Sequence, residues 1–300
     1  MNHGMMSRAA QFWRKSSTEK VRALRYHFKT EVWNRMCPGV PLLTRLPHGE
    51  WWLARNDALS DGVFARIFDG PDIKFLECAL AEGMTVIDVG GHLGFYTLLM
   101  SRRVGPGGRV VAFEPSPREF RHLETHIRIN RCANVRAEQV ALADHCGRMD
   151  LYLVDGPWTT RNSLRSPQME GVQPVSVRVA TLDQYLSANG PDRVDLIKLD
   201  AEGAELRILH GAAGLLSQAR RPIVLCELND PVIAECGWGH RGEDVLDFLE
   251  EKKFRWFELS EDGSPTPLLK CSTYCTDLVA VPEERLEEVV GGHRRGVASV

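Results

Sequence analysis

Residues 86–96 read Val-Ile-Asp-Val-Gly-Gly-His-Leu-Gly-Phe-Tyr, an apolar run that ends in a glycine-rich turn. A short β-branched run bounded by glycines is typical of a buried strand, and the apolar spacing after the turn is typical of a helix. Glycines at such a turn let the backbone bend tightly and approach a ligand beyond the carboxyl end of the strand. The stretch therefore predicts a strand, turn and helix that hold a cofactor.

Similar β-branched runs alternate with helical patterns along the chain. Strands are expected at 85–89, 109–113, 135–140, 194–199 and 222–228, and helices at 96–103, 117–130, 204–218 and 243–251. This alternation predicts an α/β fold with a doubly wound, mostly parallel sheet and helices on both faces.

Two further pairs of runs lack a helix between their members. Residues 148–154 and 173–179, separated by the polar segment 155–168, predict a β-hairpin insertion with a long loop. Residues 255–259 and 276–281 predict an antiparallel pair that closes the sheet edge. The expected central sheet has seven strands.

The composition excludes several classes of protein. With 300 residues, 43% of them hydrophobic and 26% charged, the chain is neither disordered nor a small disulfide scaffold. Its eight cysteines are scattered without a CxxC pair, which fits a reducing cytoplasm. No apolar run has the length of a membrane span or a signal peptide.

The net charge of −3 argues against a nucleic-acid partner, but it is unevenly distributed. The first 36 residues hold eight Lys or Arg and two Glu, a charge of +6, which leaves −9 for the remainder. Val21, Leu24, Phe28 and Val32 follow helical spacing and predict a basic amphipathic arm. Packing on the body or on a second subunit is the default expectation, and a membrane-surface helix or a targeting peptide remain open.

The sequence pattern divides the chain into four parts. The arm occupies residues 1–36, a cap of strand and helix 37–83, the main α/β domain 84–282, and a polar tail, expected to be frayed, 283–300.

The cofactor is indicated by two carboxylates. Glu114 ends the second strand, 26 residues after Asp88, where it can accept both hydroxyl protons of a ribose. His92 stands at the second glycine position of a GxGxxG fingerprint, and Asp88 would repel a pyrophosphate but favour the ammonium group of S-adenosylmethionine. S-adenosylmethionine is therefore the predicted cofactor. The predicted binding residues are Asp88, Gly90, Gly91, His92, Gly94, Glu114 and Pro115.

A second charged stretch, residues 195–205, again runs from a strand into a helix. Lys198 interrupts an apolar run, and an unpaired buried ammonium is costly, so it needs a partner or a functional role. Strand alternation places Lys198 and Asp200 on one face. Lys198, Asp200 and Glu202 are the predicted catalytic residues, whereas Glu205 is expected to favour the positive end of the helix.

Together, these motifs resemble the FkbM-type methyltransferases. The matching residues are 88–97, 113–115, 181–183 and 197–205. The resemblance implies the class I methyltransferase (Rossmann-like) fold, S-adenosylmethionine as methyl donor, and O-methylation of a sugar or polyketide-like molecule. One departure is Gly91-His92, where the family more often has Ala-Asn; His92 can donate a comparable hydrogen bond to the donor's amino-acid moiety.

The predicted reaction is an in-line methyl transfer to a hydroxyl of a small molecule or glycan. Asp200 or Glu202 takes or orients the acceptor proton, and Lys198 holds the acceptor or tunes the carboxylates. A metal-assisted variant would bind Mg²⁺ with Asp200, Asn229 and Asp230. An NAD-linked oxidoreductase and a non-catalytic nucleoside-binding protein are the rival classes.

The sequence does not name the acceptor, but it suggests where one would stack. The loop at 158–163, together with Trp51 and Trp52, offers aromatic and hydrogen-bonding groups suited to a sugar or an aromatic ring.

Overall fold

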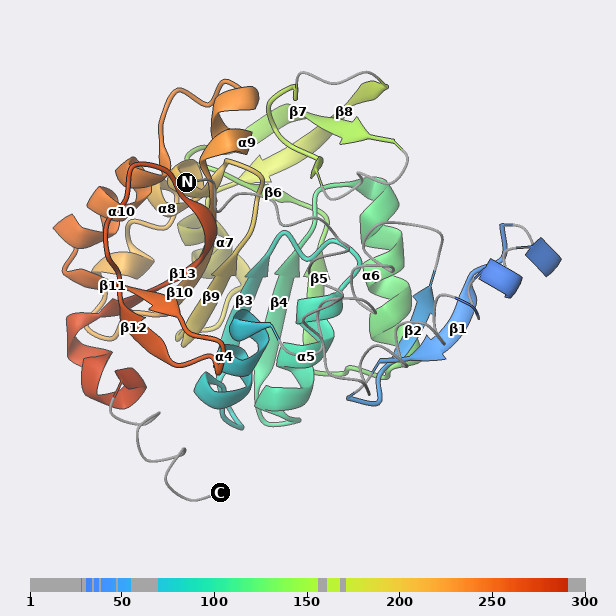
Figure 1. Cartoon of the computed structure of the whole chain (residues 1–300), viewed down its shortest axis with the longest axis horizontal. Coiled ribbons are helices and arrows are strands. Elements are labelled where there is room, and N and C mark those ends of the chain that lie inside the picture. The colour runs from blue at the N-terminus through green and yellow to red at the C-terminus, as the bar shows by residue number, and fades with distance from the viewer. Residues whose placement is uncertain are drawn as a thin grey trace.

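The computed structural model describes residues 28, 31–33, 35–37, 39–46, 48–54, 70–155, 161–167 and 171–290. Its centre is an eight-stranded sheet in the order β12-β11-β13-β10-β9-β3-β4-β5 (Figure 1). The strands are β3 (Thr85–Val89), β4 (Arg109–Phe113), β5 (Val135–Glu138), β9 (Leu196–Leu199), β10 (Ile223–Asn229), β11 (Phe254–Leu259), β12 (Pro265–Pro267) and β13 (Cys275–Pro282).

The predicted topology of this sheet is confirmed. Strands β5, β4, β3, β9 and β10 are parallel, and β13 is antiparallel to both β10 and β11. The expected count of seven strands is short by one, because β12 adds an outer edge beside β11. This strand is only Pro-Thr-Pro, which has no β-branched run to reveal it.

Helices cover both faces of the sheet (Figure 1). They are α4 (Pro71–Ala79), α5 (Phe95–Val104), α6 (Pro117–Ile129), α7 (Leu182–Asn189), α8 (Glu205–His210), α9 (Asp230–Glu235) and α10 (Gly242–Glu251), with short 3₁₀ turns at Leu215–Ser217 and Glu283–Arg285. Side chains alternate between two hydrophobic clusters: Val86 packs with α4 and α5, and Ile87 packs with α8 and α10. The period of two along β3 thus builds both cores.

The helix expected over 204–218 is too long. Helix α8 ends at His210, and a separate 3₁₀ turn follows. A Cβ atom on Gly211 would lie 2.0 Å from the carbonyl oxygen of Ala143, so the chain at this point fits closely against the segment that precedes the insertion. Tertiary packing therefore ends a helix that the apolar spacing alone would continue.

The predicted β-hairpin insertion is present. Strands β7 (Gly147–Val154) and β8 (Val172–Ala180) are antiparallel, and β6 (Ala141–Leu142) pairs with β8 in parallel. The insertion lies at the end of the molecule to which the parallel strands point (Figure 1). Residues 156–160 and 168–170 of its loop, Trp158 included, lie outside the described residues.

At the N-terminal side, β1 (Leu42–Arg45) and β2 (Trp51–Ala54) form an antiparallel hairpin beside α6. Trp52 is fully buried and stacks on His126, with ring centroids 4.1 Å apart. Most of the arm at 1–36 lies outside the described residues. None of the helices in the described ranges has both the length and the apolar character needed to cross a membrane.

The frayed tail expected from residue 283 is a wrong prediction up to Val290. Arg285 is 1% exposed and donates a 2.6 Å hydrogen bond to the carbonyl oxygen of Asp195. It also pairs with Glu288, and Val289 is buried. The sequence pattern did not predict this segment because a buried arginine, rather than an apolar run, fixes it to the rest of the chain.

Candidate active site

A cavity of about 870 Å³ opens beyond the carboxyl ends of β3, β4, β9 and β10. One half is built from the turn after β3 and the end of β4. The other half is built from the turn after β9, the end of β10 and the start of β13, with α4 beside it. This is the position at which open α/β sheets bind ligands.

The first half consists mainly of backbone. The amide groups of Gly90 and Gly91 both donate 3.0 Å hydrogen bonds to the carbonyl oxygen of Phe113, which ties the turn to β4. Gly90 has φ +80°, and a Cβ atom there would lie 1.8 Å from the carbonyl oxygen of Asp200. Gly94 has φ +95°, and a Cβ there would lie 2.8 Å from Leu123. The structure therefore requires glycine at both positions.

Glu114 lines the cavity where the sequence places it, next to Pro115. Its carboxylate accepts 2.8 Å hydrogen bonds from the backbone amides of His92 and Ser116. Only 5% of the residue is exposed, and burial raises its pKa to about 8 against these two lowering bonds. His92 also lines the cavity and holds a left-handed φ of +46°.

Asp88 lies beneath the turn rather than in the cavity wall. It is fully buried, and its Oδ2 accepts a 2.5 Å hydrogen bond from the hydroxyl of Thr97 in α5. Its Oδ1 has no hydrogen-bond partner among the described residues, and burial raises its pKa. The observed contact joins β3 to α5, and contact of Asp88 with the donor stays a prediction.

In the second half, Lys198 and Asp200 meet as the strand alternation predicts. Lys198 is 3% exposed, and its Nζ donates a 2.8 Å hydrogen bond to Asp200 Oδ2 and lies 4.2 Å from the ring centroid of Tyr96. Burial acts to lower the pKa of Lys198, but the charges of Asp200 and Asp88 raise it above its usual range. Asp200 lines the cavity and Lys198 does not. The geometry favours tuning of the carboxylate over holding of the acceptor.

Glu202 also lines the cavity, in a turn held from two sides. Its carbonyl oxygen accepts hydrogen bonds from the hydroxyl of Ser163 (2.9 Å) and the indole of Trp238 (3.2 Å), and its φ is +50°. Burial and then the charge of Asp200 raise the pKa of Glu202 to about 8. A carboxyl group with a pKa near neutral pH suits proton transfer.

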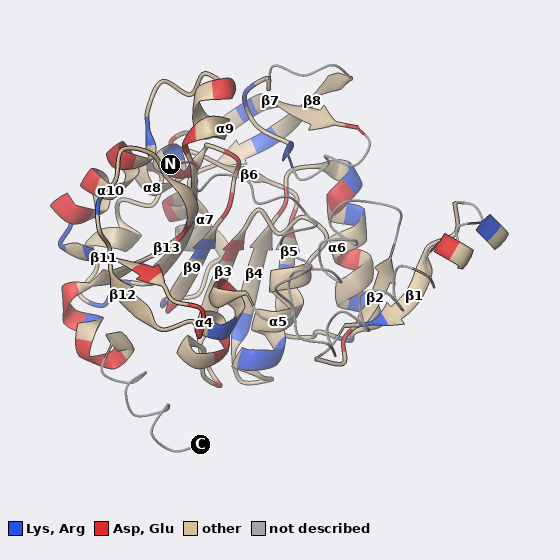
Figure 2. Cartoon of the chain, in the orientation of Figure 1, with Lys and Arg blue, Asp and Glu red and all other residues tan. Residues whose placement is uncertain are grey.

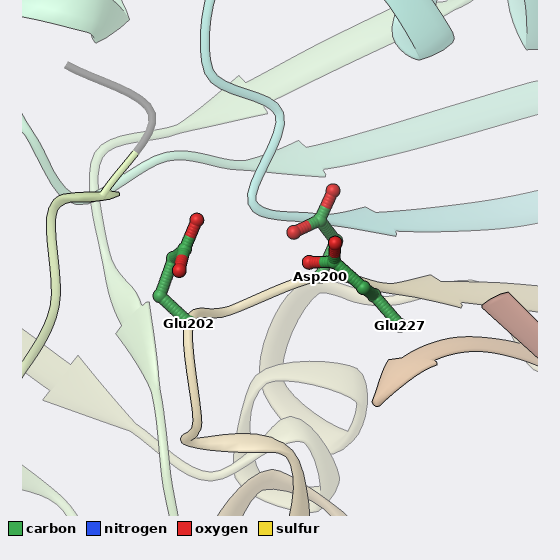
Figure 3. Close-up of side chains that lie close together, drawn as sticks. All are labelled: Asp200, Glu202 and Glu227. Atoms are coloured by element: carbon green, nitrogen blue, oxygen red, sulfur yellow. The ribbon is translucent and has the colours of Figure 1, made fainter. Parts of the chain in front are cut away.

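Glu227, at the end of β10, completes a cluster of carboxylates. Carboxylate oxygens of Asp200, Glu202 and Glu227 lie within 4.8 Å of one another, with Glu202 across the turn from the other two (Figure 3). The charge of Asp200, followed by burial, raises the pKa of Glu227 well above its usual range. The pKa of Asp200 is lowered because Lys198 and hydrogen bonds outweigh its burial.

The proposed Mg²⁺ ligands do not all meet. Asn229 lines the cavity and caps α9, but Asp230 accepts 2.6 Å hydrogen bonds from the amides of Gly242 and Tyr274. Asp230 is therefore a structural acceptor between loops. Glu205 is also structural, since it accepts hydrogen bonds from the amides of Ala201 and Gly203 at the start of α8.

The expected aromatic surface is also wrong in part. Trp52 is buried beside α6, and Trp51 is 37% exposed with Arg45 over its ring. Neither lines the cavity. From the insertion, Asn162 and Leu164 contribute to the wall.

Sequence reasoning missed several lining residues. These are Asp72 at the start of α4, Tyr96, Glu227 and Asp277. The signal for Glu227 was present, since it is a charged residue in an otherwise apolar strand, as Lys198 is. Asp277 reaches the site because β13 pairs with β10 in the register that sets it opposite Glu227.

Comparison with known proteins gives a consistent answer. A family model described as the methyltransferase FkbM domain matches residues 88–256, more than half of the chain. "Methyltransferase 1" of Beauveria bassiana is 31% identical over 147 residues, which is 42% of this chain and 57% of that protein. "2-O-methyltransferase NoeI" of Sinorhizobium fredii is 27% identical over 143 residues, 43% of this chain and 57% of that protein. The chain thus spans less than two thirds of these relatives.

Among solved structures, an O-methyltransferase from Bacillus cereus in complex with SAH aligns with a TM-score of 0.43 at 14% identity. The alignment covers 90% of this chain and 93% of that one.

Proposed function

The chain belongs to the FkbM methyltransferase family, and we propose that it transfers the methyl group of S-adenosylmethionine to a hydroxyl of a sugar, glycan or polyketide-like molecule. Family membership supports the class of enzyme and S-adenosylmethionine as its methyl donor. The proposal concerns the acceptor and the residues that act on it. The observation that carries it is the position of Glu202, a half-buried carboxyl group in the same cavity as the glycine turn.

The residues of the first half fit S-adenosylmethionine. Gly90 lets the turn after β3 pack against the carbonyl oxygen of Asp200, where a Cβ atom would clash, and Glu114 lines the cavity at the end of β4. We assign Gly90, Gly91, His92, Glu114 and Pro115 to donor binding, with Asp88 and Gly94, which do not line the cavity, supporting the turn. The donor supplies a methyl group already activated by the positive sulfonium.

The chain must then position the acceptor and remove its proton. Glu202, with its raised pKa, accepts the hydroxyl proton as the oxygen attacks in line. Asp200 is kept ionised by Lys198 and orients the hydroxyl by accepting a hydrogen bond. Residues of α4 and of the insertion form side walls of this cavity.

Two further features support the details of this proposal. The name of NoeI specifies 2-O-methylation by that protein, which favours a hydroxyl acceptor here. All eight cysteines carry free thiols, in keeping with the predicted cytoplasmic location.

The test is methyl transfer from donor labelled in its methyl group to a panel of neutral sugars, glycans and phenolic compounds. We expect label in at least one hydroxyl-bearing acceptor, and calorimetric binding of S-adenosylhomocysteine but not of NAD. Transfer only to amines would contradict the proposed acceptor. Donor binding without transfer across the panel would favour the non-catalytic alternative.

A second candidate is the same transfer assisted by Mg²⁺, favoured by the three carboxylates of Figure 3. Glu202 and Glu227 would replace the predicted Asn229 and Asp230 as ligands beside Asp200. A cation here would lower the pKa of the acceptor hydroxyl. Full activity after exhaustive chelation would exclude this candidate, and activity restored only by Mg²⁺ would support it.

A further inference from the structure

Exposed apolar side chains gather at the N-terminal side of the molecule. Seven large hydrophobic residues are strongly exposed in the described part of the chain, and six of them fall between residues 28 and 51. They are Phe28, Val32, Met36, Val40, Leu43 and Trp51, whereas Leu269 lies apart. Phe28, Val32 and Met36 recur at intervals of four in the sequence, the spacing of residues on one face of a helix. Such a concentration marks an interaction surface.

A basic hollow adjoins the same hairpin. It has a volume of about 1070 Å³ and lies between the turn of β1–β2 and the amino ends of β4 and β5. Five arginines line it against one carboxylate, that of Glu50; they are Arg45, Arg102, Arg109, Arg131 and Arg136. The blue segments on the hairpin and at the lower end of α5 mark part of this surface in Figure 2.

Several of these charges are available to a partner. Arg102 is paired with Glu50 and Glu77, and Arg136 with Glu138. Arg109 and Arg131 are exposed and form no ion pair with a carboxylate within the described ranges. Arg45 is exposed and lies over the ring of Trp51, 4.2 Å from its centroid. A cation and an exposed aromatic ring therefore share one place on the hairpin.

This surface lies at the amino ends of the parallel strands, whereas the reaction cavity lies at their carboxyl ends. Arg109 is the first residue of β4, and Glu114 follows the last. A partner bound at the amino edge would leave the cavity open to an acceptor.

We propose that the exposed apolar residues of 28–51 and the arginines of the hollow form one face that binds an anionic membrane surface. Peripheral membrane binding combines apolar groups inserted at the headgroup level with cations attracted to anionic lipid. The sequence before this face is also basic, with six Lys or Arg and one Glu among residues 1–27. In the described part of the chain, charge complementarity to lipid phosphates comes from the arginines of the hairpin and the hollow.

The test is sedimentation of the full chain with vesicles of phosphatidylcholine alone or mixed with phosphatidylglycerol. We expect binding only to the anionic vesicles, and weaker binding as salt rises. The double variant Arg109→Glu with Arg131→Glu should weaken partitioning at least roughly 30-fold, from about 1 kcal/mol for each cation removed. Met36→Ser with Leu43→Ser should also weaken it.

Matched controls distinguish this face from charge in general. Arg148→Glu with Arg178→Glu changes the net charge equally on the exposed insertion, and Leu269→Ser removes the remote apolar side chain. These controls should bind as the unaltered chain does. Equal weakening by them, or binding independent of phosphatidylglycerol, would overturn the proposal. So would a change of oligomeric state in the test variants with vesicle binding intact, which would assign the face to a second copy.

Discussion

The two halves of the reaction cavity are built by different means. The donor half is a single turn with a carboxylate at the neighbouring strand end, and its shape is set by backbone hydrogen bonds and by glycines packed closely against their neighbours. The acceptor half is a set of carboxyl side chains from β9, β10 and β13 around one buried lysine. Changes of backbone shape should therefore damage the first half, and changes of charge the second.

The largest effect is expected from Gly90→Ala, because this residue touches both halves. Its Cβ would lie 1.8 Å from the carbonyl oxygen of Asp200, and φ is +80°. Left-handed strain costs roughly 1–3 kcal/mol and overpacking a similar amount. We expect loss of measurable donor binding by calorimetry and a lower melting temperature. Gly107→Ala, where no atom lies within 4 Å, should leave both unchanged; an intact Gly90→Ala enzyme would contradict the close approach.

The next effect is confined to the acceptor half. Glu202→Gln keeps the size of the side chain but removes the proposed base, so kcat should fall about 10²–10⁴-fold. Donor affinity should stay unchanged because Glu202 belongs to the other wall. The control Glu124→Gln alters an exposed carboxylate on α6 and should keep full activity. An unchanged kcat in Glu202→Gln would transfer the role of base to another residue.

A smaller effect is expected in the donor half, where a substitution should lower donor affinity rather than kcat. Above pH 8, where Glu114 is ionised, Glu114→Gln replaces a charged acceptor by a neutral one, and a hydrogen bond to a charged group contributes roughly 1.5–3 kcal/mol. Donor affinity should therefore fall about 10- to 100-fold by calorimetry, with kcat at saturating donor largely retained. Reduced kcat with unchanged donor affinity would show that the two halves had been assigned the wrong way round.

The same contrast explains what the sequence can predict. The place of the donor half in the fold could be predicted, because residues 86–96 are contiguous and Glu114 ends the next strand, but Asp88 and Gly94 lie outside the cavity wall. Lys198 and Asp200 could be paired from alternation along a single strand. These features depend on local geometry, which periodicity records.

The rest depends on contacts between distant segments. Asp277 faces Glu227 only through the register of β13 on β10, and Asp72 arrives on a helix that precedes the sheet. Asp230 follows a strand end, as site residues do, yet the amides of Gly242 and Tyr274 occupy its oxygens. A sequence pattern identifies the end of the strands at which a residue lies. It does not identify the groups that form hydrogen bonds with that residue.

The smallest expected effect is a pH dependence of kcat and of donor affinity, each governed by a carboxyl group in a different half of the cavity. The pKa values of both Glu202 and Glu114 are raised to about 8 by burial, so each carboxyl group loses its proton only as the pH approaches 8. At saturating donor, kcat should rise up to tenfold per pH unit below this value, and Glu202→Gln should abolish that dependence. Donor affinity should rise over the same range, and Glu114→Gln should abolish that one.

Stability should change in the opposite direction to activity. With pKa values of about 8 in the folded chain and 4.5 when exposed, Glu202 and Glu114 bind more protons in the folded state between these values. The unfolding free energy should therefore fall as the pH rises from about 4.5 to 8. Melting temperatures of the two Gln variants should depend less on pH in this window than that of the unaltered chain. Parallel curves for all three would show that neither carboxyl group is held protonated by burial, which would also remove the reason to expect Glu202 to act as base near neutral pH.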